Sequence, residues 1–199
     1  MKKIYIVLTH TGTMLSKIIK KYTKDEFSHI SIALDIELNE MYSFGRLNPY
    51  SPLWAGFVHE YKDKGTFKRF YNTKTKIYSL EITDKQYEII KNNIKKIQEN
   101  KEEYKFNMLG LVAAGFHKKV RMDHSFYCAE FVKYIMEKAE ISTGLPEVVK
   151  PEDFKEIDDL QEVYKGLLRK YQSPKGLLRE NLLTYSAKKE GIVWVEKIK

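Results

Sequence analysis

The stretch Ser125-Phe-Tyr-Cys-Ala-Glu-Phe-Val-Lys-Tyr-Ile-Met-Glu137 holds the only cysteine of the 199-residue chain, Cys128. Apolar residues recur in it at helical spacing, which predicts an amphipathic helix with Cys128 on the buried face. With Ser125 as the N-cap, Cys128 falls in the first turn, where unpaired N–H groups and the helix dipole favour a thiolate. The helix alone fits both a buried structural thiol and a reactive one.

A second stretch, Phe27-Ser-His-Ile-Ser-Ile-Ala-Leu-Asp35, places His29 near the start of a predicted strand, about a hundred residues before the cysteine. A histidine beside an apolar strand is often structural. However, a helix that carries a cysteine and packs against a strand that carries a histidine would bring a nucleophile next to a base. The two stretches together therefore favour a catalytic pair.

The order and context of these stretches resemble the circularly permuted papain-like fold of the NlpC superfamily. The YiiX/YaeF-like amidases and the lecithin:retinol acyltransferases are branches of this superfamily, in which the histidine also precedes the cysteine. The resemblance covers about residues 1–155. It is carried by the His-strand Ser28-His-Ile-Ser-Ile-Ala-Leu34, by Met41-Tyr-Ser-Phe-Gly-Arg46 for the next strand, and by Phe126-Tyr-Cys-Ala-Glu-Phe-Val132 for the Cys-helix.

The resemblance implies a hydrolase or acyltransferase that acts on an amide or ester through a thioester. Cys128 would attack the acyl carbon, while His29 would take its proton and return one to the leaving group. The backbone N–H of Cys128 would supply one oxyanion donor. Family members also carry a third polar residue on the strand after the His-strand. Ser43 occupies this position here, where His, Glu, Asn or Gln is more usual.

The register of the predicted hairpin determines whether Ser43 can reach His29. A tight turn around Ile36 would place Ser43 opposite His29. A wider turn centred on Leu38 would place Leu47 there, and Glu60 or a backbone carbonyl would then hold the imidazole ring. The sequence leaves both alternatives open.

The predicted fold class is α+β, with an antiparallel sheet packed against the Cys-bearing helix. Composition fits one compact unit, since 43% of the residues are apolar and 13% aromatic. We expect a catalytic domain over 1–155 and a helical tail over 156–199 packed on it. The expected strands are 3–9, the His-strand hairpin, 67–71 and 76–82. The expected helices are 11–22, one that starts at Thr83-Asp84, the Cys-helix, 153–168 and 173–189, followed by a last strand at 192–195.

The apolar run from Met108 to Phe116 has two interpretations. It is far shorter than the roughly 20 residues of a membrane span. It can form a core helix or a loop that leads to the site, or it can dip into a membrane interface. The first is the preferred interpretation.

Charge and histidine patterns argue against several other classes of function. The net charge is +8, yet 30 of the 35 basic residues are Lys and lie dispersed among acidic residues. Specific nucleic-acid binding is therefore not expected, although the charge would attract an anionic membrane surface. None of the five histidines falls in a metal-ligand motif, and there is no glycine-rich phosphate loop, so we expect no metal or cofactor.

The expected partner is a small-molecule, peptide or lipid substrate, and the oligomeric state is left open. A single cysteine excludes an intramolecular disulfide and suits a reducing compartment, and we find no export signal, so the expected location is the cytoplasm. The alternative function is a non-catalytic module that binds a lipid or peptide on the same fold. In that case Cys128 would be unreactive.

Overall fold

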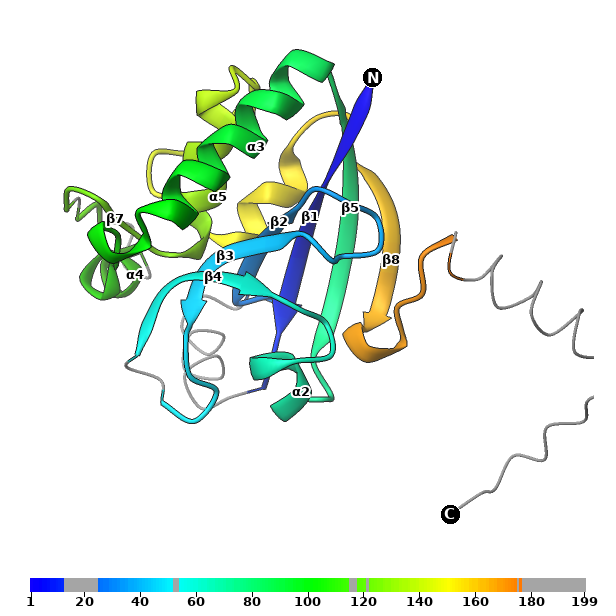
Figure 1. Ribbon diagram of the computed structural model, residues 1–199, viewed down its shortest axis with the longest axis horizontal. Coiled ribbons are helices and arrows are strands. Elements are labelled where there is room, and N and C mark those ends of the chain that lie inside the picture. Colours follow the sequence, from blue (N-terminus) through cyan, green and yellow to red (C-terminus); the bar gives the residue numbers. More distant parts are fainter. Residues whose placement is uncertain (13–24, 52–53, 115–117, 121, 175, 177–199) are drawn as a thin grey trace, which may run out of the picture.

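The computed structural model describes residues 1–12, 25–51, 54–114, 118–120, 122–174 and 176. It is a mixed α+β structure built on a six-stranded antiparallel sheet (Figure 1). In spatial order the strands are β4 (Ala55–Glu60), β3 (Met41–Arg46), β2 (His29–Ala33), β1 (Lys2–His10), β5 (Lys74–Ile82) and β8 (Gln161–Leu167). Helices α3 (Asp84–Glu99) and α5 (Cys128–Lys138) cover one face of the sheet.

Strand β1 is apolar from Ile4 to Leu8 because both faces of the sheet are buried around this part of it. Ile4, Ile6 and Leu8 point to the core under α3 and α5, whereas Tyr5 and Val7 belong to a smaller core on the opposite face. This alternation has the two-residue period of a strand. The predicted strands at 3–9, 28–34, 41–46 and 76–82 are confirmed as β1, β2, β3 and β5.

The two helices bury apolar stripes at the spacing that the sequence predicted. In α3, Ile90, Ile94 and Ile97 are buried, and the helix starts with a capping box between Thr83 and Gln86. In α5, buried apolar residues follow Cys128 along one face and pack against β2 and β3: these are Phe131, Val132, Ile135 and Met136. The helix that bears the cysteine therefore packs on the strand that bears the histidine.

Between β3 and β5 the structure differs from the prediction in one expected strand and in one strand that was not expected. The expected strand at 67–71 is instead a short helix, α2 (Gly65–Arg69), in which Phe67 is buried. A five-residue helix buries one aromatic side chain without the alternating burial that a strand needs. Strand β4 lies in a stretch that the sequence analysis left without an assigned strand. The expected helix at 11–22 lies, apart from its first two residues, outside the described residues.

The expected helical tail is wrong where the structure describes it. A 3₁₀ segment, η2 (Pro151–Glu156), leads into strand β8, which pairs with β5 and forms the edge of the main sheet. The charged residues of β8 face water along this edge, which made its sequence resemble a charged helix. A boundary at 155/156 therefore divides a continuous structure. Almost all of the expected helix at 173–189, and the strand at 192–195, lie outside the described residues.

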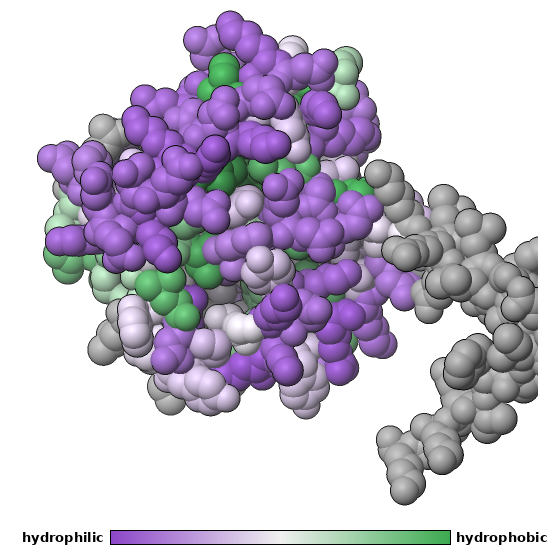
Figure 2. Space-filling model, viewed as in Figure 1, coloured by the Kyte–Doolittle hydropathy of each residue, from purple (hydrophilic) through white to green (hydrophobic). Residues whose placement is uncertain are grey.

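The apolar run from Met108 forms the helix α4 (Met108–Ala114), in which Leu111 packs against the main core but two other large side chains are exposed. Gly110 and Ala114 are buried, while Leu109 and Val112 are 65% and 57% exposed. Figure 2 shows apolar atoms at the left edge of the molecule, where α4 lies in Figure 1. In the described part of the chain, no helix has both the length and the apolar character to cross a membrane.

Candidate active site

Cys128 is the first residue of α5 and is 4% exposed. The N-cap is Tyr127, and the predicted N-cap Ser125 instead belongs to the short strand β7 (Ser125–Phe126), which pairs with β6 (Lys105–Phe106). The backbone N–H of Tyr127 donates to the Glu130 side chain at 3.1 Å, and the Tyr127 hydroxyl donates to the Val149 carbonyl at 2.8 Å. Cys128 is thus held in the first turn, where backbone N–H groups have no acceptor within the helix.

His29 is the first residue of β2, and its imidazole connects two functional side chains. Its Nε2 lies 3.0 Å from Oε1 and 3.3 Å from Oε2 of Glu60. The side chain of Cys128 is also close enough to the imidazole to help raise the pKa of His29. Because Nε2 is directed at the carboxylate, Nδ1 is the ring nitrogen left for the thiol. The structure therefore brings together Cys128, His29 and Glu60, from α5, β2 and β4.

Strands β2 and β3 pair over only two positions, Ile32 with Tyr42 and Ala33 with Met41. Continued at the same register, the pairing would set Gly45 opposite His29, which is neither of the two partners that the turn alternatives predicted. A Cβ atom at Gly45 would lie 3.2 Å from Cε1 of His29. The missing side chain of Gly45 thus leaves room for the imidazole ring.

Ser43 does not contact the imidazole. It is fully buried, and its hydroxyl donates to the backbone carbonyl of Ile30 at 2.7 Å. It thereby satisfies a carbonyl close to the point where β2 and β3 stop pairing. The alternative residue from the sequence analysis, Glu60, is the one whose carboxylate lies against His29. Its backbone pairs with Met41, which in turn pairs with Ala33 on the His-strand.

Ser31 is a member of this group that the sequence analysis did not single out. It is fully buried, and its hydroxyl donates to Oε2 of Glu60 at 2.5 Å. The same hydroxyl lies 3.5 Å from Nε2 of His29. The two-residue period of a strand could have indicated it, because His29 and Ser31 are two residues apart and share a face.

The charge of Glu60 controls the protonation of His29. Burial alone would lower the pKa of His29, but the negative charge of Glu60, the hydrogen bond with Cys128 and the hydrogen bond with Glu60 outweigh burial. Together they raise the pKa of His29 from 6.5 to about 10. At neutral pH the ring is therefore an imidazolium, which can stabilise a thiolate beside it.

The segment that leads into His29 is held by the chain around η2. Glu152 accepts a hydrogen bond from the backbone N–H of Phe27 at 2.6 Å. Ion pairs join Lys150 to Asp25 at 3.5 Å and Lys155 to Glu26 at 3.8 Å. A part of the chain far from both sequence motifs therefore fixes the start of the His-strand.

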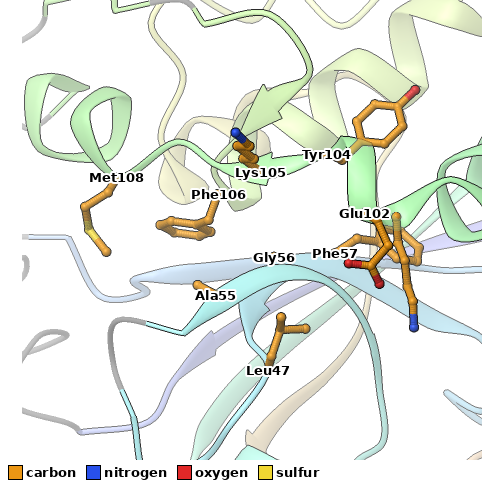
Figure 3. Close-up of a pocket in the computed structure, with 10 residues that line it drawn as sticks. Leu47, Ala55, Gly56, Phe57, Glu102, Tyr104, Lys105, Phe106 and Met108 are labelled. Carbon is orange, nitrogen blue, oxygen red and sulfur yellow. The ribbon is translucent and has the colours of Figure 1, made fainter.

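A cavity of about 420 Å³ lies between the end of the β3–β4 hairpin and the segment that leads into α4. Figure 3 shows Leu47, Ala55 and Gly56 on one side of it and Phe106 and Met108 on the other. Gly56 is the cross-strand partner of Gly45, which adjoins the imidazole. A cavity lined by both apolar and charged residues thus begins one strand away from His29.

Of the other histidines, His10 contacts Ser28, with Nδ1 3.3 Å from the hydroxyl oxygen. His124 is exposed and packs against Tyr104, with ring centroids 5.3 Å apart. Within the described ranges, no three side chains of His, Cys, Asp or Glu gather in a set that could hold a metal ion.

A scan against protein-family models matched none of them, and searches of curated proteins and of solved structures returned no significant match.

Proposed function

We propose that this protein is a cysteine hydrolase or acyltransferase that cleaves an amide or an ester through a thioester intermediate. The observation that carries this proposal is the position of His29, whose imidazole joins the Cys128 thiol to the Glu60 carboxylate. A nucleophile, a base and a group that orients the base are the three parts that nucleophilic acyl transfer needs. The resemblance to the permuted papain-like fold of the NlpC superfamily, with the histidine before the cysteine, agrees with this chemistry.

In the proposed reaction, the Cys128 thiolate adds to the acyl carbon and forms the S–C bond. The oxygen of the substrate takes the negative charge, and the backbone N–H of Cys128 at the start of α5 is positioned to stabilise it. The His29 imidazolium then gives its proton to the leaving amine or alcohol as the bond to the acyl carbon breaks. Water or another acceptor next loses a proton to His29, attacks the thioester and releases Cys128.

Glu60 has two roles in this scheme. It orients the ring through the 3.0 Å contact between Oε1 and Nε2, and its charge stabilises the imidazolium that forms with each proton transfer. Glu60 replaces Ser43 as the third member of the proposed group.

The cavity next to Gly56 has the volume of a small-molecule site. Apolar residues line part of it, and Lys101, Glu102 and Lys105 line the rest. We therefore expect a substrate that carries both apolar and polar groups near the scissile amide or ester. A free thiol nucleophile suits the reducing cytoplasm, which is where we expect the protein to act.

The rate of Cys128 alkylation by iodoacetamide, measured against pH, tests the proposal. A thiolate paired with an imidazolium reacts well below pH 8.5, where an ordinary thiol is still protonated. We expect fast labelling at pH 6 in the native protein and at least a tenfold slower rate in His29→Ala. The variant His124→Ala, four residues before the cysteine, is the matched control and should react like the native protein. Labelling that is slow at pH 6, or indifferent to His29, contradicts the proposal.

The cavity also favours a second candidate, a non-catalytic module that binds a lipid or a peptide. In this case the cavity would hold its ligand while Cys128 reacted only as an ordinary thiol. Binding of a fluorescent fatty acid or an apolar peptide, together with slow alkylation at pH 6, would support the module instead of the enzyme.

A further inference from the structure

We propose that Ser31 is a positioning residue of this site, which holds the Glu60 carboxylate in the orientation that His29 requires. The inference rests on the proposed function. Ser31 lies two residues after His29 on β2 and is fully buried. Its hydroxyl is 2.5 Å from Oε2 of Glu60, while Oε1 of the same carboxylate is 3.0 Å from Nε2 of His29.

The donors and acceptors available on Ser31, Glu60 and His29 determine the direction of these hydrogen bonds. An ionised carboxylate only accepts, and a serine hydroxyl has one proton to give, so Ser31 donates to Oε2. The imidazolium donates from Nε2 to Oε1. One strand thus supplies both donors to a carboxylate that arrives from β4. Ser31 donates to Oε2, and Nε2 of His29 lies closer to Oε1, at 3.0 Å, than to Oε2, at 3.3 Å, so the two donors together fix the orientation of the carboxylate.

The hydroxyl also serves a carboxylate oxygen that water reaches poorly, because Glu60 is only 9% exposed. Without the hydroxyl, Oε2 would lose its donor in a buried place, and the carboxylate could rotate away from Nε2 of His29. Such a rotation would weaken the attraction between Glu60 and His29.

Ser43 provides a matched comparison on the neighbouring strand. Both serines are fully buried, and both hydroxyls donate one short hydrogen bond. Ser43 donates to the backbone carbonyl of Ile30, whereas Ser31 donates to the charged group beside the imidazole. Loss of either hydroxyl should lower stability, but only loss of Ser31 should change the titration of His29.

The test uses the full chain with Ser31→Ala and Ser43→Ala, and two readouts. The first is the titration midpoint of the His29 Hε1 proton by NMR, and the second is the rate of Cys128 alkylation at pH 6. In Ser31→Ala we expect the midpoint to fall by about one pH unit and the alkylation rate by about tenfold, as for the loss of a hydrogen bond to a charged group. In Ser43→Ala we expect both to stay at the native values.

The isosteric pair Ser31→Thr and Ser31→Val extends the test and replaces Ser31→Ala if that variant does not fold. Both side chains suit a strand, and only threonine keeps the hydroxyl, so threonine should retain the native titration and valine should not. The inference about Ser31 is overturned if Ser31→Thr and Ser31→Val give equal readouts, or if Ser31→Ala and Ser43→Ala do. The proposed function still stands in that case, provided that Cys128 of the native protein is alkylated fast at pH 6. A native protein that alkylates like a free thiol overturns the proposed function as well.

Discussion

Replacement of Glu60 by glutamine tests the electrostatics of the site most directly. The carboxamide keeps the shape of the side chain and an oxygen that can accept from Nε2 of His29, but it removes the negative charge. We expect the pKa of His29, raised to about 10 in the native protein, to fall towards its ordinary value. The residue remains in place, so the change reports charge rather than packing.

The size of the fall follows from the geometry. With Oε1 3.0 Å from Nε2, the centres of the two charges lie about 4 Å apart, and the attraction at an effective dielectric constant of about 20 is ~4 kcal/mol. At 1.36 kcal/mol for each pH unit, this corresponds to about three units. The pKa of His29 in Glu60→Gln is therefore expected at about 7.

The assay is a two-dimensional NMR titration of the histidine Hε1 protons between pH 5 and 11. The chain has five histidines, so the signal of His29 can be assigned by its loss in His29→Gln. The control is Glu81→Gln, which removes the carboxylate that pairs with Lys3 at 3.1 Å on another strand. A native His29 that titrates near 6.5, or a midpoint that Glu60→Gln leaves unchanged, would refute the electrostatic argument.

Two further predictions concern the space around the imidazole and the pH dependence of stability. Gly45→Ala places a Cβ atom 3.2 Å from Cε1 of His29, so alkylation of Cys128 at pH 6 should slow about tenfold. The control Gly56→Ala, on the partner strand, should leave the alkylation rate unchanged. Equal rates in the two variants would contradict the close fit between Gly45 and the imidazole. In Cys128→Ser the pKa of His29 should remain above 6.5, because Glu60 is still present. The ion pair of His29 with Glu60 then contributes fully to stability below about pH 6.5, and this contribution is lost as the pH rises through the pKa of His29 in the folded protein. Urea unfolding at pH 6 to 10 should show this decline, and a free energy of unfolding that stays flat or rises would oppose it.

The local parts of the site were predictable from the sequence. The positions of Cys128 in the first turn of a helix and of His29 at the start of a strand follow from apolar periodicity, which depends on residues close in the chain. The start of α3 at Thr83 follows from its capping box in the same way.

The third residue of the candidate site, beside Cys128 and His29, could not be predicted from the sequence, because its position depends on strand pairings between distant residues. Glu60 reaches His29 through the register of β4 on β3, and the sequence between these strands gives no measure of that register. The hairpin of β2 and β3 took a register between the two that the turn alternatives suggested. As a result Gly45, and neither Ser43 nor Leu47, adjoins the imidazole.

The C-terminal part was mispredicted for a similar reason. The segment Gln161–Leu167 has the charge pattern of a solvated helix, but β5 presents an unpaired edge that a strand can complete. Local propensity is weak compared with such a pairing. An edge strand is therefore hard to recognise when its partner lies some eighty residues earlier in the chain.

The contacts between η2 and the segment before His29 have a consequence for the synthesis of the protein. Glu152, Lys150 and Lys155 hold residues 25–27, and all three follow α5 in the chain. A nascent chain in which α5 has just formed therefore still lacks the contacts that hold the segment before His29. We expect the proposed pair of Cys128 and His29 to reach its final geometry only after η2 has packed against residues 25–27.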